Sequence, residues 1–102
     1  LDWSTVPLLD GVRQLAAQGF VTGASGRNWA GYGAEIGLPA GFAAEDRALL
    51  TDPQTSGGLL VSCAPGSVAE VLAVFHRHGF GQAACIGEIA AAEPGAARLQ
   101  VR

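Results

Sequence analysis

A helix flanked by two strand-like runs is the feature that most constrains the fold of this chain. The helix is expected at 67–78, because apolar residues recur there on one face and Gly79 is suited to ending it. Ser67 and the glutamate three residues later have the spacing of a capping box. The apolar run 58–63 suits a strand covered on both faces, and 83–89 reads as a second strand. The order strand, helix, strand predicts a crossover unit in a sheet.

Weaker patterns place further elements around this unit. The first residues read as a short edge strand, and residues 20–41 read as irregular because they are rich in Gly and small polar residues. Pro94 and Gly95 suit a type II turn that would join the last two strands into a hairpin. Two helices and the final strand are expected at 7–18, 43–50 and 98–101. Residues 1–102 are therefore predicted to form a single α+β domain, with helices packed on a mixed β-sheet and a partly ferredoxin-like topology.

The composition excludes several classes of function. The 102 residues carry a formal net charge of -3 and have a pI near 5.1, which gives no attraction to nucleic acid or to an acidic membrane surface. No apolar run approaches the roughly 20 residues needed to cross a bilayer. Lysine is absent, so a Walker-type phosphate loop is excluded and any cation offered to a phosphate must be an arginine. We expect a cytoplasmic protein that binds neither nucleic acid nor membrane.

Other residue types give mostly negative expectations. Methionine is absent, and we expect the chain to be an excised piece of a longer protein. Cys63 and Cys85 fall within the strand-like runs and are expected to be buried free thiols. His76 and His78 point apart on the predicted helix with no third ligand nearby, so no metal site is predicted. No acid and base pair can be named from spacing, and no catalytic residue is assigned.

The first segment that is difficult to explain as an ordinary connection is 22–28, Thr-Gly-Ala-Ser-Gly-Arg-Asn. Its glycines would let successive backbone N–H groups converge on an anion, and Arg27 supplies a forked cation suited to phosphate oxygens. Thr22 and Asn28 are the other candidate phosphate-binding residues of this segment. A plain surface turn explains the same residues, so both interpretations stay open.

The second such segment is 51–58, which leads directly into the predicted strand at 58–63. Asp52 could accept hydrogen bonds from backbone amides in a turn ahead of Pro53, and the hydroxyls and glycines that follow could present donors to a phosphate. The candidate residues are Asp52, Gln54, Thr55, Ser56, Gly57 and Gly58. The alternative is a turn that only holds the strand in register.

Three segments together resemble a known family. Residues 52–60, Asp-Pro-Gln-Thr-Ser-Gly-Gly-Leu-Leu, resemble the signature of bacterial selenophosphate synthetases, also called selenide, water dikinases, in the aminoimidazole ribonucleotide synthetase-like superfamily. Residues 22–33 resemble the family's Arg-Asn-aromatic segment that ends in Tyr-Gly, and 86–89 is similar to its Ile-Gly-Glu strand. The resemblance covers essentially the entire chain and implies the carboxy-terminal domain of a two-domain enzyme, with that domain's α+β fold.

The resemblance implies an activity for the parent enzyme. Family members make selenophosphate from selenide and ATP and release AMP and orthophosphate, with magnesium and often a monovalent cation. Their nucleophilic Cys or selenocysteine, essential Lys, and the aspartates that hold magnesium and ATP lie in the amino-terminal half or at its junction. The isolated chain is therefore expected to be inactive and to bind no cofactor tightly. Its expected partners are the missing amino-terminal ATP-binding domain and, in the full-length enzyme, a second copy in a homodimer.

The resemblance also implies a role for the two polar segments. In the family this domain packs against the ATP-binding domain and helps wall the active-site cleft. We hypothesise that Arg27, Asn28, Thr55 and Ser56 help to hold a phosphoryl product or intermediate. Two alternatives stay open: a stand-alone small-molecule or phosphate-binding regulatory module, and a purely structural or dimerisation domain.

Overall fold

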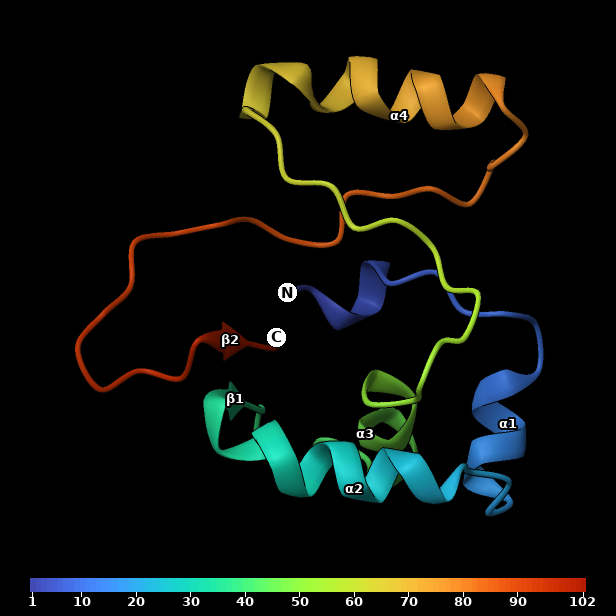
Figure 1. Cartoon of the computed structure of the whole chain (residues 1–102), viewed down its shortest axis with the longest axis vertical. Helices are drawn as coiled ribbons and strands as arrows, with labels where there is room; N and C mark the ends of the chain where they lie inside the picture. The colour runs from blue at the N-terminus through green and yellow to red at the C-terminus, as the bar shows by residue number, and fades with distance from the viewer.

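The computed structural model describes residues 1–102 and is of the α+β class, which confirms the predicted fold class (Figure 1). Short helical turns and extended connections link four α-helices and one pair of strands. In chain order the elements are η1 (Trp3–Thr5), α1 (Val12–Ala17), α2 (Gly23–Tyr32), η2 (Gly33–Glu35), β1 (Ile36–Gly37), α3 (Ala44–Leu50), η3 (Pro65–Ser67), α4 (Val68–Arg77) and β2 (Leu99–Gln100). None of the helices is long and apolar enough to cross a membrane.

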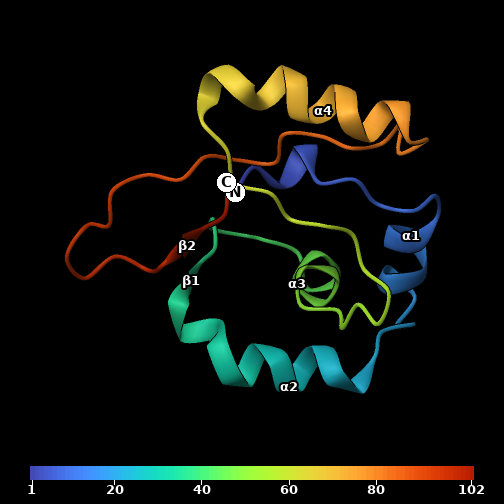
Figure 2. The same ribbon diagram turned by 45° about the horizontal axis from the view of Figure 1, so that its top comes forward.

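Helices α1, α2 and α3 gather at one end of the molecule, and α4 lies at the other (Figure 1). Helix α3 contacts both α1 and α2, and Figure 2 looks nearly along α3 with the other two beside it. An ion pair joins Arg13 on α1 to Asp46 on α3, with 2.8 Å between Nε and Oδ1. The three-helix end is therefore tied together by packing and by charge.

A small core connects these helices to the strands. The buried hydrophobic side chains are Trp3, Ala16 and Val101, one each from the amino-terminal turn, α1 and the carboxy terminus. Trp3 packs edge to face against Phe42, with 5.8 Å between ring centroids, and the guanidinium of Arg13 lies 5.9 Å from its ring centre. Trp3 thus holds the start of the chain against the helical end.

The strands form where the two chain ends meet. β1 and β2 pair in parallel, with Ile36 opposite Leu99, and the N–H of Val101 continues the pairing to the carbonyl of Gly37. On the other side, the amino group of Leu1 donates to the carbonyl of residue 100, and the N–H of residue 102 donates to the carbonyl of Leu1. Figures 1 and 2 show both termini at this point. The carboxy-terminal residues therefore run between β1 and the first residues of the chain.

Two predicted helices are confirmed. α4 covers most of the predicted 67–78, and Gly79, which follows the C-cap His78, has a φ of 89°, the left-handed conformation expected after a helix. α3 covers most of the predicted 43–50 and stops at Thr51, shortly before Pro53. The capping box expected at Ser67 is wrong, because its side chain makes no cap hydrogen bond. A 3₁₀ turn beginning at Pro65 leads into α4 instead.

Two other helical predictions need correction. The helix expected at 7–18 is reduced to α1, because Gly11, with φ of 77°, takes up a left-handed conformation directly before it. The stretch 20–41 was expected to be irregular, yet it contains the ten-residue helix α2. Helix α2 is made mostly of small and polar residues and has no apolar stripe, so periodicity gives no signal for it.

The predicted strands are wrong in all but the last case. Residues 58–63 and 83–89 do not form strands, and residues 57–63 make no backbone–backbone hydrogen bond. The expected edge strand at the start of the chain is η1, and the hairpin does not form, because β2 pairs in parallel with β1. Cys63 and Cys85 are exposed, so the expectation that they are buried is also wrong.

Candidate functional site

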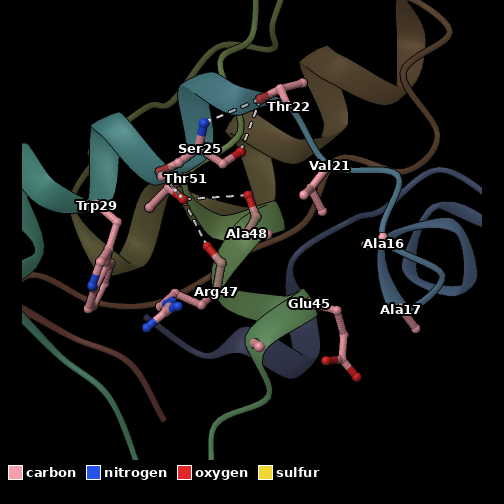
Figure 3. Close-up of a pocket in the computed structure, with 13 residues that line it drawn as sticks. Ala16, Ala17, Val21, Thr22, Ser25, Trp29, Glu45, Arg47, Ala48 and Thr51 are labelled. Atoms are coloured by element: carbon pink, nitrogen blue, oxygen red, sulfur yellow. Dashed lines mark hydrogen bonds between the residues drawn. The ribbon is translucent and has the colours of Figure 1, made fainter.

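The first turn of α2 is organised by Thr22. The Thr22 side chain is the N-cap, and its Oγ1 accepts from the backbone N–H of Ser25 at 3.3 Å. The hydroxyls of Thr22 and Ser25 also lie 3.1 Å apart, as drawn in Figure 3. Ser25 is buried against α3, while Thr22 is exposed. The cap thus joins an exposed residue, Thr22, to a buried one, Ser25.

A direct side-chain contact joins the two polar segments. The Thr22 hydroxyl donates to Oδ1 of Asp52 at 3.1 Å, across 30 residues of sequence. The other carboxylate oxygen, Oδ2, accepts from the side-chain amide of Gln54 at 2.8 Å. Three of the residues named from the sequence are therefore in contact in the folded chain.

Below this contact, the buried Thr51 ties the end of α3 to α2. Its Oγ1 lies 2.9 Å from the carbonyl of Arg47 and 3.2 Å from the carbonyl of Ser25, so its one proton is shared between two helices (Figure 3). The side-chain amide of Asn28 donates to the Thr51 carbonyl at 2.8 Å, and its oxygen accepts from the Tyr32 hydroxyl at 3.3 Å. Asn28 therefore has a structural role as well as a place in the predicted site.

The remaining predicted residues are exposed. Arg27 makes no ion pair, and the hydroxyls of Thr55 and Ser56 make no hydrogen bond. Gly57 closes a tight turn, because a Cβ at that position would lie 2.7 Å from the Cβ of Gln54. The segment is thus folded back on Asp52 and Gln54, and its hydroxyls face solvent.

A hollow of about 380 Å³ lies between α1, α2 and α3, beside the Thr22 cap. Thr22 and Ser25 line it, but Asp52 and residues 54–58 do not. Figure 3 shows Trp29 and Arg47 along one side, where the guanidinium carbon of Arg47 lies 5.2 Å from the Trp29 ring centre. The hollow is lined largely by small side chains, and the residues of the two polar segments that line it are Thr22, Ser25, Gly26 and Thr51.

The third motif segment lies elsewhere. Glu88 lines a second hollow of about 290 Å³ with Asp2, Cys85 and Arg102, and its Oε1 is 3.5 Å from Nη2 of Arg102. The backbone N–H of Asp2 donates to the carbonyl of Ile86. The Ile-Gly-Glu segment thus contacts the two chain ends and not the polar segments.

The residues present do not make a magnesium site. Magnesium prefers several oxygen ligands in octahedral geometry. The two polar segments offer one carboxylate, Asp52, and both of its oxygens already accept hydrogen bonds. No group of three or more His, Cys, Asp or Glu side chains is placed to hold a metal ion.

Sequence reasoning missed Ser25 and Thr51, the two buried polar residues that support the site. Both lie inside the named segments, but small hydroxyl residues are common in surface turns as well. A weak signal existed for Thr51, because a Thr at the end of a helix often bonds back to a carbonyl one turn earlier.

Comparison with known proteins decides the kinship. No protein-family model matches the chain. It is 59% identical over 91 residues to a selenide, water dikinase from Paraburkholderia xenovorans, covering 89% of the chain and 26% of that protein. It is 56% identical over 99 residues to the selenide, water dikinase of Burkholderia pseudomallei, covering 97% of the chain and 27% of that protein. The chain is related to one segment of the selenide, water dikinases.

The kinship predicted from the motif segments is thereby confirmed. A selenide, water dikinase from Rhizobium meliloti is still 48% identical over 98 residues. The chain spans about a quarter of the length of the curated selenide, water dikinases that it matches.

Proposed function

We propose that this chain is the carboxy-terminal domain of a cytoplasmic selenophosphate synthetase and that it walls part of the active-site cleft. The full-length enzyme would make selenophosphate from selenide and ATP and release AMP and phosphate. The observation that carries the proposal is the Thr22–Asp52 contact, which brings the two segments that resemble the family signature onto one exposed surface. Identity of 48–59% to selenide, water dikinases supports the same assignment.

Within this proposal, Arg27, Thr55 and Ser56 hold a phosphoryl product or intermediate. Their side chains are exposed and not engaged by other residues, so they are free to bind an anionic group presented by another domain. An arginine offers paired donors to phosphate oxygens, and hydroxyls add further donors. Asn28 acts as a support, because its amide already donates to the backbone of Thr51.

ATP and magnesium, in this proposal, are held by the rest of the longer polypeptide. The two polar segments contribute donors and a single carboxylate, which suits a half-site that a second domain completes. The isolated chain would then bind neither group tightly and would not turn over ATP.

One observation favours a second role, that of a packing domain. Leu59, Leu60 and Ile89 are large apolar side chains that are more than four-fifths exposed. Exposed apolar surface commonly marks a contact with another protein surface. A structural role at a domain interface would account for these residues without any contact to phosphate.

The proposal is tested by replacing Arg27 with Ala in the full-length enzyme. Hydrogen bonds to charged groups contribute about 1.5–3 kcal/mol, so selenophosphate formation should fall roughly 10- to 100-fold. The matched control is Arg77→Ala, because Arg77 is also exposed and makes no ion pair, but lies on α4 away from the polar segments. Unchanged activity in Arg27→Ala, measured as selenophosphate formed per enzyme, would remove the proposed role of Arg27 and favour the packing domain.

A further inference from the structure

Asp52 occupies a special position between the two polar segments. Its bond to Thr22 is the only side chain–side chain hydrogen bond that links residues 22–28 to residues 51–58. Its second oxygen binds Gln54, which lies within the turn that leads to the exposed hydroxyls. One carboxylate therefore contacts the cap of α2 on one side and the exposed turn on the other.

The bonds of Asp52 differ in kind from those of its neighbours. Thr51 and Asn28 bond to backbone carbonyls and hold the end of α3 against α2. Those bonds remain when the Asp52 side chain is removed, so the packing of the two helices does not depend on it. What depends on Asp52 is the placement of residues 54–58, which are exposed and have no hydrogen bond to α2.

The charge of Asp52 argues against direct contact with a phosphoryl group. A carboxylate repels a phosphate at close range, and both oxygens of Asp52 already accept hydrogen bonds from uncharged donors. The neighbouring Pro53 has a fixed φ and further restricts how the turn leaves Asp52. Asp52 is thus suited to holding the turn in place and poorly suited to binding the phosphate itself.

We propose that Asp52 is a positioning residue, which sets the placement of Thr55 and Ser56 relative to the first turn of α2 through its bonds to Thr22 and Gln54. The expected effect of Asp52 on activity rests on the proposed function. The expected effect of Asp52 on the structure of the turn does not. The role lies in the geometry of two hydrogen bonds and does not require the negative charge.

Two substitutions of Asp52 separate geometry from charge in the full-length enzyme. Asp52→Ala removes both bonds and the charge. Asp52→Asn removes only the charge, because the Asn oxygen can accept from Thr22 and its NH₂ can donate to Gln54 once the Gln54 amide has turned over. Asp10→Ala is the matched control, since Asp10 is an exposed carboxylate without a hydrogen-bond partner.

The readouts are steady-state kinetics and the rate at which a broad-specificity protease cleaves within residues 54–58. For Asp52→Ala we expect kcat to fall about tenfold with a smaller change in KM, because the positioned hydroxyls act on a phosphoryl product or intermediate. We also expect about tenfold faster cleavage at residues 54–58, from the loss of two hydrogen bonds. Asp52→Asn should restore most of both losses. If Asp52→Ala fails to fold, Thr22→Val breaks the same bond from the other side, with Thr22→Ser as its control.

Three outcomes would overturn the inference. Asn as damaging as Ala, with protease cleavage at 54–58 unchanged, would mean that the charge matters and not the geometry. Unchanged cleavage in both Asp52→Ala and Thr22→Val would mean that the bond does not place the turn. An unchanged kcat in Asp52→Ala despite faster cleavage, in an enzyme that still depends on Arg27, would mean that the placement is not used. If instead activity is insensitive to Arg27 while Asp52→Ala speeds cleavage, the proposed function fails and the positioning role remains.

Discussion

Asp2 fixes the first turn of the chain with a single carboxylate oxygen. Its Oδ1 accepts from the hydroxyl of Ser4 at 2.7 Å and from the backbone N–H of Ser4 at 3.1 Å. The hydroxyl bond is the main cause that holds the pKa of Asp2 below its ordinary value of 3.8, and the backbone bond and the nearby Arg102 act in the same direction, while desolvation opposes them. The turn that carries the buried Trp3 is therefore more stable when Asp2 is ionised.

This lowered pKa predicts how stability responds to acid. Because the folded chain holds the Asp2 proton less tightly than the unfolded chain, protonation favours unfolding. The contribution is present above the ordinary value of 3.8 and is lost as the pH falls through the lowered pKa of the folded state. Asp2→Asn should therefore reduce the loss of thermal stability between about pH 5 and about pH 2. If the melting temperatures of Asp2→Asn and of the unchanged chain fall by the same amount across this pH range, the prediction is contradicted. Asp10→Asn is the control.

Helices were predictable from the sequence where a local pattern specifies them. Apolar residues at helical spacing and Gly79 located α4, and the proline at 53 located the end of α3. Helix α2 was missed because its stability comes from the Thr22 cap and from packing on α3, and neither leaves an apolar stripe. Strands failed for a related reason, since pairing joins residues far apart in sequence, such as Ile36 and Leu99.

The end of α4 gives a prediction at the scale of one element. Gly79 has φ of 89° and no atom within 4 Å of where a Cβ would lie, so Gly79→Ala changes only the backbone energy. Left-handed backbone costs a non-glycine residue about 1–2 kcal/mol, and we expect the free energy of unfolding to fall by about 1 kcal/mol. Urea denaturation of both chains measures this change in the free energy of unfolding. Gly81→Ala, which has open space and no positive φ, is the control, and equal loss in both variants would contradict the prediction.

At the scale of the whole molecule, the chain is less compact than its length allows. Its radius of gyration is 14.9 Å, against about 13 Å for a typical domain of 100 residues. Only Trp3, Ala16 and Val101 form the buried apolar core. The sequence indicated Thr22 and Asp52 as candidates, but the contact between them depends on how α2 packs on α3, and no local pattern encodes that packing.

The exposed apolar residues predict self-association of the isolated chain. Leu59 and Leu60 are 81% and 84% exposed in an extended stretch with unpaired backbone, which is a template for pairing with another chain. We expect the weight-average mass in sedimentation experiments to rise with concentration. Replacing both leucines with Thr should reduce this rise, while Leu9→Thr, which changes a similarly exposed residue on its own, should not. A chain that stays monomeric at every concentration would contradict the expectation.

The hydrogen bonds between the first and last residues have a practical consequence for engineering. Leu1 bonds to the backbone of both residues 100 and 102, so a short peptide linker could join the two ends into a ring. New ends opened at the exposed turn around Pro94 and Gly95 would then leave β1, β2 and the Thr22–Asp52 contact on uninterrupted stretches of chain. In such a circular permutant, a fused protein would be attached at this turn and no longer beside β2, and the candidate site would be unaltered.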